Sequence, residues 1–242
     1  AVSPKGKFTA TWANIKAGGK VKAAPSAKKS VIVVPRDYAT IQEAIDAAKP
    51  GDKVVVQKGT YTGATVTKAV EIEGTDAVIN DGPNSHSFLR AGFLFLNDGT
   101  GSGATIRGFK FVGEAQSGYT DDSKLDFPIF SRGADNVTIE HNEMVNSLQA
   151  ISNWHGSGWN ISHNKIDGLW VLCGGGIGIL IASWNNIPAN NNLVAYNKIT
   201  ADVSPDCAFY TTSGIGLYSD ARWGTPGGPV QNNKVVHNTS VV

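Results

Sequence analysis

Charged residues are scarce in this chain of 242 residues, where they make up 17% of the sequence against roughly 25% in an average soluble domain. The formal net charge at neutral pH is only +1. A nucleic-acid-binding domain normally carries a concentrated basic face, so the composition argues against nucleic acid as a partner. Most lysines of residues 1–30 have no aromatic neighbours, and this stretch is predicted to be a flexible, solvated arm.

Long apolar runs are also missing. No stretch approaches the ~18 consecutive apolar residues that a membrane span needs, so we expect no transmembrane segment. The sequence opens with Ala1-Val-Ser-Pro and has no apolar leader. Such a start is typical of an exported protein after removal of its signal peptide, so we expect a secreted or cell-surface protein.

Cysteine is limited to Cys173 and Cys207. Their separation, 207 − 173 = 34 residues, is about one period of the repeat described below. They could therefore form a disulfide between neighbouring repeats in an oxidising compartment, and two buried free thiols fit equally well. No Cys-x-x-Cys motif or Cys/His cluster predicts a zinc site.

Glycine is abundant, with 28 residues, and Asn, Thr and Val are frequent. This composition favours strands and turns over helices. The sequence predicts one good helix, because Thr40 and Glu43 form a capping box. Ile41, Ala44, Ile45 and Ala48 then follow with helical spacing, and 50–51 (Pro-Gly) ends the helix.

A loose repeat governs the rest of the chain. A β-branched or apolar run is followed, after two variable positions, by an anchor residue in the segments 104–109, 137–142, 160–164, 193–197 and 234–238. The anchors are separated by 33, 22, 33 and 41 residues. A variable period of this size predicts a β-solenoid whose turns carry insertions. We expect the anchor amides to stack in a hydrogen-bonded ladder: Asn142, Asn164, Asn197 and Asn238.

A second row of strands is predicted before these segments, at 127–130, 150–153, 176–179 and 214–217. Alternation with period two places one set of residues inward: Ile129, Ile151, Ile177 and Ile215. Their neighbours are expected to point outward and to line a continuous groove: Phe130, Ser152, Gly178 and Gly216.

Three segments near the start carry a family resemblance. They are Ala-Thr-Ile-Gln-Glu-Ala-Ile at 39–45, Pro-Gly-Asp-Lys-Val-Val-Val at 50–56 and Gly-Thr-Tyr at 59–61. Together they resemble the N-terminal cap and first coil of pectate-lyase-like proteins, and the repeats extend the resemblance over about 31–242. It implies an all-β fold, a right-handed single-stranded parallel β-helix over 31–242 with an N-terminal capping helix, behind the arm of residues 1–30.

The resemblance does not imply one activity. The superfamily includes polysaccharide lyases, glycoside hydrolases, pectin methylesterases, uronan epimerases and noncatalytic surface modules, so the function has to come from the site. The segment 126–130 is faintly similar to a methylesterase motif, but Pro128 interrupts it and the partner Gln-Asp motif is absent. Asp121 and Asp122 lie in the polar insertion 114–126, which is either a solvated loop or, with Asp126, a Ca²⁺ site.

A lyase or epimerase needs a base, a cation that neutralises the uronate carboxylate, and an acid. Candidates follow the predicted outward strands in different repeats, although each alone could be an ordinary surface or turn residue. The predicted catalytic residues are Arg132, His155, Asp220 and Arg222. Aromatic residues at strand ends or turns suit the apolar faces of sugars. Those predicted to bind substrate are Trp154, Tyr218 and Trp223, while Trp184 is a further ring at a strand end.

We therefore expect a secreted protein that acts on an acidic, uronate-containing polysaccharide by lyase or epimerase chemistry. A noncatalytic polysaccharide-binding or surface-adhesion module is the first alternative, and a fragment of a larger exported protein is the second. The sequence stops at 240–242 within a repeat and without a polar cap. A solenoid end needs covering, so end-to-end self-association through the C-terminal coil is expected if the arm does not cover it.

Overall fold

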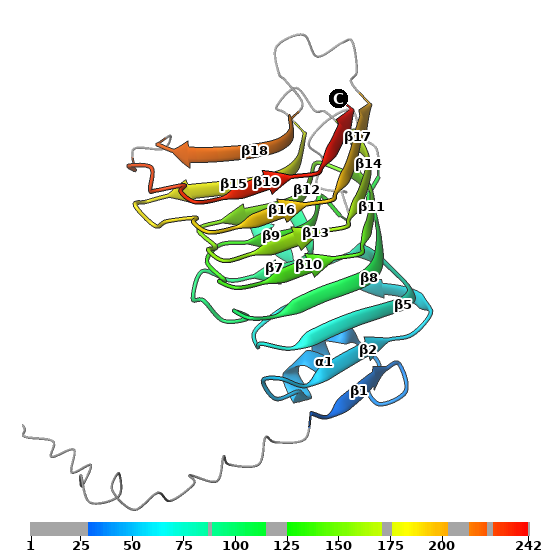
Figure 1. Ribbon diagram of the computed structural model, residues 1–242. Helices are drawn as coiled ribbons and strands as arrows, with labels where there is room; N and C mark the ends of the chain where they lie inside the picture. Colours follow the sequence, from blue (N-terminus) through cyan, green and yellow to red (C-terminus); the bar gives the residue numbers. More distant parts are fainter. Residues whose placement is uncertain are drawn as a thin grey trace, which may run out of the picture.

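The computed structural model describes residues 29–86, 89–114, 125–170, 176–202, 213–221 and 225–241. Within them the fold is almost entirely β, with strands arranged in two large sheets and one short helix (Figure 1). No helix in this part of the chain has the length and apolar character needed to cross a membrane. The predicted arm lies outside the described residues, apart from 29 and 30.

The larger sheet has 13 strands, which form two rows with a bend between them (Figure 1). The long strands β5 (Glu71–Asp81) and β8 (Thr105–Val112) run through both rows, since β8 pairs with β10 at its start and with β11 at its end. The remaining strands are β1 (Val31–Val34), β2 (Lys53–Val56), β3 (Gly59–Thr62), β10 (Thr138–Glu140), β11 (Glu143–Ser147), β13 (Asn160–Ser162), β14 (Lys165–Trp170), β16 (Leu193–Ala195), β17 (Lys198–Asp202), β19 (Lys234–Val236) and β20 (Thr239–Val241).

The smaller sheet has seven strands, and all of its pairs are parallel except that of β6 with β7. Its strands are β4 (Ala64–Thr65), β6 (Asn84–His86), β7 (Leu89–Phe95), β9 (Phe127–Ser131), β12 (Gln149–Trp154), β15 (Ile177–Trp184) and β18 (Ser213–Asp220). The two sheets enclose a continuous apolar core. From β9 onward, each repeat unit supplies one strand to this sheet and two to the larger one, beginning with β9, β10 and β11.

The repeat predicted from the sequence is confirmed as parallel strand pairing. Ile139 pairs with Ile106 on one side and with Ile161 on the other, and Val194 follows Ile161. Their side chains are at most 1% exposed. Equivalent residues of successive repeats are therefore direct neighbours, about 4.8 Å apart as in any sheet.

The asparagine ladder is also confirmed. The Asn142 side-chain amide donates to Asn164 Oδ1 at 3.0 Å, Asn164 donates to Asn197 Oδ1 at 3.0 Å, and Asn197 donates to Asn238 Oδ1 at 2.9 Å. Each oxygen also accepts from the backbone N–H of the preceding member, and Phe109 N–H donates to Asn142 Oδ1 at 3.1 Å. The ladder satisfies backbone groups at a buried bend where the regular strand pairing is interrupted.

The register of the smaller sheet corrects one prediction. Ile129 pairs with Ile151 as expected, but Ile151 pairs with Ile179, which in turn pairs with Ile215. Ile177 instead pairs with Gln149 and Ser213. Ile177 and Ile179 are two residues apart on one strand and therefore share a face. Alternation alone cannot decide which of them pairs with Ile151.

The predicted outward row is not an open groove. Phe130, Ser152, Leu180 and Gly216 are in register, with Leu180 in the place expected for Gly178. Phe130 is only 2% exposed and Ser152 is fully buried. Phe130 belongs to a second apolar cluster, which makes this side of the sheet hydrophobic. The cluster consists of Leu89, Ala91, Leu94, Phe127, Phe130 and Leu148, and Trp154 packs against it.

Helix α1 (Ile41–Ala47) begins at the predicted capping box. Glu43 N–H donates to Thr40 Oγ1 at 3.2 Å, and Thr40 N–H donates to Glu43 Oε2 at 3.0 Å. The helix buries its apolar stripe in the main core. At its other end, Lys68 Nζ donates to three backbone carbonyls, those of Ile45, Asp46 and Ala48. This cation satisfies acceptors that a helix leaves unpaired.

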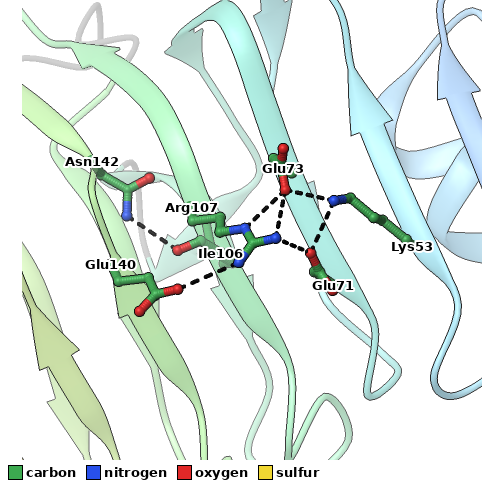
Figure 2. Close-up of polar contacts among 7 residues, drawn as sticks. All are labelled: Lys53, Glu71, Glu73, Ile106, Arg107, Glu140 and Asn142. Carbon is green, nitrogen blue, oxygen red and sulfur yellow. Dashed lines mark hydrogen bonds and ion pairs between the residues drawn. The ribbon is translucent and has the colours of Figure 1, made fainter.

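Charged side chains alternate in sign across four neighbouring strands of the larger sheet (Figure 2). Lys53 Nζ lies 2.6 Å from Glu73 Oε2, and Arg107 donates from Nε to the same oxygen at 2.8 Å. Arg107 also contacts Glu71 and, at 3.6 Å, Glu140. The hydrogen bond from Lys53 is the main reason why the pKa of Glu73 lies below its usual value. These side chains are about one-quarter to one-third exposed, so their contribution to stability is modest.

Asn164→Ala is expected to lower the free energy of unfolding by about 2–4 kcal/mol, because it leaves buried donors and acceptors of Asn142, Ile139 and Asn197 without partners. The measurement is chemical denaturation. Asn238→Ala is the matched control, since Asn238 makes similar bonds but is half-buried, so water can replace them and the loss should be about 1 kcal/mol. Equal losses for the two variants would contradict this account of the ladder.

Candidate functional site

Side chains of several kinds meet where the strands of the smaller sheet end. We call them the strand-end cluster: Arg132, Trp154, His155, Trp184, Tyr218 and Asp220. The register brings them together, because Trp154 pairs with Ala182, Ala182 pairs with Tyr218, and Trp184 pairs with Asp220. Carboxyl ends of parallel strands share one edge of a sheet, so residues of four successive strands converge here. Five of the six were selected from the sequence as site residues.

His155 is the most unusual member of the cluster. Its backbone is left-handed, with φ of 66°, and its N–H donates to Ala182 O at 2.8 Å. The side chain is only 6% exposed, yet neither ring nitrogen has a hydrogen-bond partner among the described residues. Its ring centroid lies 5.9 Å from that of Trp184. Buried polar atoms without partners are costly and uncommon, and they mark sites where function has to be considered.

The turn that carries His155 is firmly held. Asn153 accepts from Gly156 N–H at 2.8 Å and donates to Gly156 O at 3.0 Å. Trp159, predicted to be structural, is 1% exposed and donates from Nε1 to Ala134 O at 2.7 Å. The imidazole therefore projects from a rigid turn, which is the arrangement that a positioned proton carrier needs.

The electrostatics keep the imidazole neutral. Burial lowers the pKa of His155, and the positive charge of Arg132 lowers it further. A neutral imidazole has a nitrogen lone pair that can accept a proton at neutral pH. Desolvation and a neighbouring cation thus favour the neutral form of His155, the form that can accept a proton.

Arg132 follows the last residue of β9 and is half-buried. Its backbone N–H donates to Phe95 O at 3.2 Å, and its guanidinium carbon lies 5.6 Å from the Phe130 ring centroid. Within the described part of the chain, no carboxylate forms an ion pair with it. A cation held in this way can bind an external carboxylate.

Trp184 joins the site through the register. Sequence reasoning noted it only as a ring at a strand end, and the indole Nε1 proves to be buried and unpartnered. Ser183 and Ser219, on the adjacent positions, both donate to Gly228 O, at 2.6 and 2.9 Å, and so fix the ends of β15 and β18. Asp220 is 6% exposed, and Tyr218 is 44% exposed. The cluster thus has a buried polar part and an exposed aromatic part.

The predicted calcium ligands do not form a site that can be described. Asp126 is fully buried, its Oδ2 accepts from Arg90 N–H at 2.8 Å, and its backbone carbonyl accepts from Leu148 N–H at 3.0 Å. Asp126 therefore links three adjacent strands. Asp121 and Asp122 lie outside the described residues, and within these residues no group of three or more His, Cys, Asp or Glu side chains suits a metal. Calcium binding stays a prediction.

Four further residues of interest also lie outside the described ranges. They are the predicted site residues Arg222 and Trp223 and the two cysteines, Cys173 and Cys207. Their predicted roles remain untested.

Replacing His155 is expected to change the pH dependence of stability. Because the pKa of His155 is lower in the folded chain than in the unfolded one, the unfolded chain binds more protons as the pH falls. The stabilising contribution is complete above the unfolded pKa of about 6.5 and is lost as the pH falls towards the folded pKa. Denaturation midpoints measured at about pH 7.5 and 5.5 should therefore differ more for the native chain than for His155→Asn, which also tolerates the left-handed backbone. An equal difference would count against a buried neutral imidazole.

Comparison with known proteins adds no assignment to this geometry. No family model matches the chain, and no curated protein or solved structure matches it either.

Proposed function

We propose that this chain is a secreted, pectate-lyase-like protein that acts on an acidic, uronate-containing polysaccharide, with β-elimination at the strand-end cluster as its reaction. The fold assigned to it is a right-handed single-stranded parallel β-helix, with α1 as its N-terminal cap. Three strands per repeat unit from β9 onward and the parallel register support this fold. The burial of α1 against the first strands supports the capping role.

The observation that carries the proposed activity is the buried imidazole of His155 beside the cation of Arg132, since neither side chain has a hydrogen-bond or ion-pair partner in the part of the chain that the structure describes. β-Elimination in a uronate requires the removal of the proton next to the carboxylate. The carboxylate gains negative charge as this proton leaves, so a nearby guanidinium lowers the barrier. A base and a carboxylate-binding cation within one cluster are the two groups that the first step needs.

The proposed reaction balances without a redox partner. His155 takes the proton from C5 of the uronate, a double bond forms between C4 and C5, and the bond from C4 to the glycosidic oxygen breaks. Asp220, in register with Trp184 at the same edge, is the group assigned to protonate the leaving oxygen. An epimerase shares the first step but returns a proton to the opposite face of C5.

The aromatic part of the cluster fits a sugar chain. Trp154 is half-buried and Tyr218 is exposed, and both occupy one row that includes Ala182. Rings with an apolar face and a polar tip suit pyranose rings. Because His155 is only 6% exposed, substrate reaches it only after neighbouring side chains move.

The same burial favours a second candidate function. A noncatalytic polysaccharide-binding or adhesion module needs the exposed ring of Tyr218 and the half-buried ring of Trp154 but no accessible base. Apolar side chains of the last strands are exposed, namely Leu217, Val235 and Val241. End-to-end self-association and membership of a larger exported protein therefore stay predictions.

The activity is tested by incubating the chain with polygalacturonate or alginate, with and without Ca²⁺, and following the ultraviolet absorbance of the unsaturated uronate product. His155→Asn is expected to lower the rate by about 10²–10⁴, because the base is lost. Arg132→Gln should raise KM and lower kcat, since the cation meets the carboxylate in both the ground state and the transition state.

Arg36→Gln is the matched control, because Arg36 is an exposed arginine paired with Asp37 far from the cluster along the chain. Its rate should equal that of the native chain. Binding of the polymer without any unsaturated product would assign the noncatalytic function, and neither binding nor product would overturn both candidates for these polymers.

A further inference from the structure

Four aromatic side chains stack on the outside of the larger sheet, and we call them the ring ladder: His141, His163, Tyr196 and His237. Successive ring centroids are 4.9, 5.0 and 5.0 Å apart, and the planes are inclined by 19°, 19° and 12°. All four side chains are exposed. The ladder runs along the stacking direction of the strands, at the bend between β10, β13, β16 and β19 and the strands that follow them (Figure 1).

The backbone at the ring ladder is in an unfavourable conformation. Each ladder residue immediately precedes a member of the asparagine ladder and has a left-handed φ between 54° and 58°. The equivalent bend in β8 uses Gly108, with φ of 74°. Glycine adopts this conformation at the lowest cost, and among the other residues Asn, Asp and His are enriched in it, so the cost is greatest at Tyr196. Costly left-handed residues that recur at one position are a reason to look for a function.

The row that follows the ring ladder on its outer side is mainly cationic. It contains Lys110, Glu143, Lys165 and Lys198 in register, and Thr239 ends it. Glu143 lies 3.2 Å from Lys165 Nζ and 3.6 Å from Lys110 Nζ. Lys198 forms no ion pair among the described residues, so the cationic row is not fully neutralised by its own carboxylates.

The other charges near the ring ladder are few. On the preceding side the in-register row runs from Arg107 and Glu140, which pair with each other, to Ser162, Ala195 and Val236. Asp167, one outward position beyond Lys165, accepts from Thr200 Oγ1 at 2.5 Å and lies 3.5 Å from Lys165. Lys234 is exposed at the start of β19. Beside the ring ladder, Lys110, Lys165 and Lys198 therefore outnumber the carboxylates of Glu143 and Asp167.

We propose that the ring ladder and its lysine row form a binding strip for a linear polyanion, namely an acidic polysaccharide chain lying along the stacking direction. The ring faces are turned towards one another, so the edges with their N–H and O–H groups face solvent. These edges recur every 4.9–5.0 Å beside the lysine ammonium groups. Regular donors and cations complement a polymer whose carboxylates recur along its length.

The strip is separate from the strand-end cluster. Cluster residues precede β10, β13 and β19 along the chain, whereas ladder residues follow these strands, so the two surfaces lie at opposite ends of short strands (Figure 1). The choice of an acidic polysaccharide as the ligand rests on the proposed function, but binding to the strip does not require His155 to act as a base. The strip would hold one part of a long polymer while the strand-end cluster acts on another part of the same polymer.

The test measures polygalacturonate binding by isothermal titration calorimetry, in a His155→Asn background that prevents turnover of the polymer. The ladder variant is His163→Asn/Tyr196→Asn/His237→Asn, because asparagine removes the rings but accepts the left-handed backbone. It is expected to bind at least about tenfold more weakly, because the ring edges that donate to the polymer are lost. Lys165→Gln/Lys198→Gln, at in-register positions of the cationic row, should also weaken binding and reduce its salt dependence.

Thr138→Ala/Leu193→Ala is the matched control, because it alters the start of β10 and β16 and leaves the ladder intact. Circular dichroism and thermal melting verify that each variant is folded. Unchanged affinity in both the ladder and the lysine variants, or equal binding of the neutral polymer dextran by the native chain, would overturn the proposal. Failure of the proposed lyase activity gives a different result, namely polymer binding without unsaturated product in the His155-containing chain.

Discussion

In-register parallel pairing is the constraint on which the remaining features depend. It places equivalent residues of successive repeats directly beside one another, as Ile106, Ile139 and Ile161 show. A side chain that can bond to a copy of itself then gains one more favourable contact with every added repeat. Asparagine does so through its amide, which both donates and accepts, and flat rings do so by stacking. The buried amide ladder and the exposed ring ladder are two results of one geometry at consecutive positions.

The same pairing penalises like charges and isolated polar groups. Between β2, β5, β8 and β10 the chain avoids repulsion by alternating Lys53, Glu71 and Glu73, Arg107 and Glu140 (Figure 2). Among the described residues, buried side-chain atoms without hydrogen-bond partners also occur singly, at Ser147, Asn160 and Thr225. Those of His155 and Trp184 are distinctive because the two rings lie together at the strand ends.

Two surfaces with different properties result from this arrangement. The strand-end cluster combines the buried side chains of His155 and Asp220 with the half-buried ones of Arg132, Trp154 and Trp184 and the exposed ring of Tyr218. The ring ladder is exposed, repetitive and flanked by lysines. A compact site suits a reaction at one sugar, whereas a repetitive strip suits contact with a polymer over several units. Both proposals concern an acidic polysaccharide, but each can be overturned without the other.

The sequence by itself determined the elements whose signals are local. Thr40 and Glu43 defined the start of the helix, and the spacing of Asn142, Asn164, Asn197 and Asn238 defined the parallel stacking and its ladder. It also selected five members of the strand-end cluster, because strand ends are recognisable in each repeat. Only the tertiary structure decided the register of Ile179 in place of Ile177, the burial of Phe130 and Ser152, and the contact of Trp184 with His155. Alternation with a period of two fixes the face of a residue but not its partner, and turns of unequal length hide which residues become neighbours.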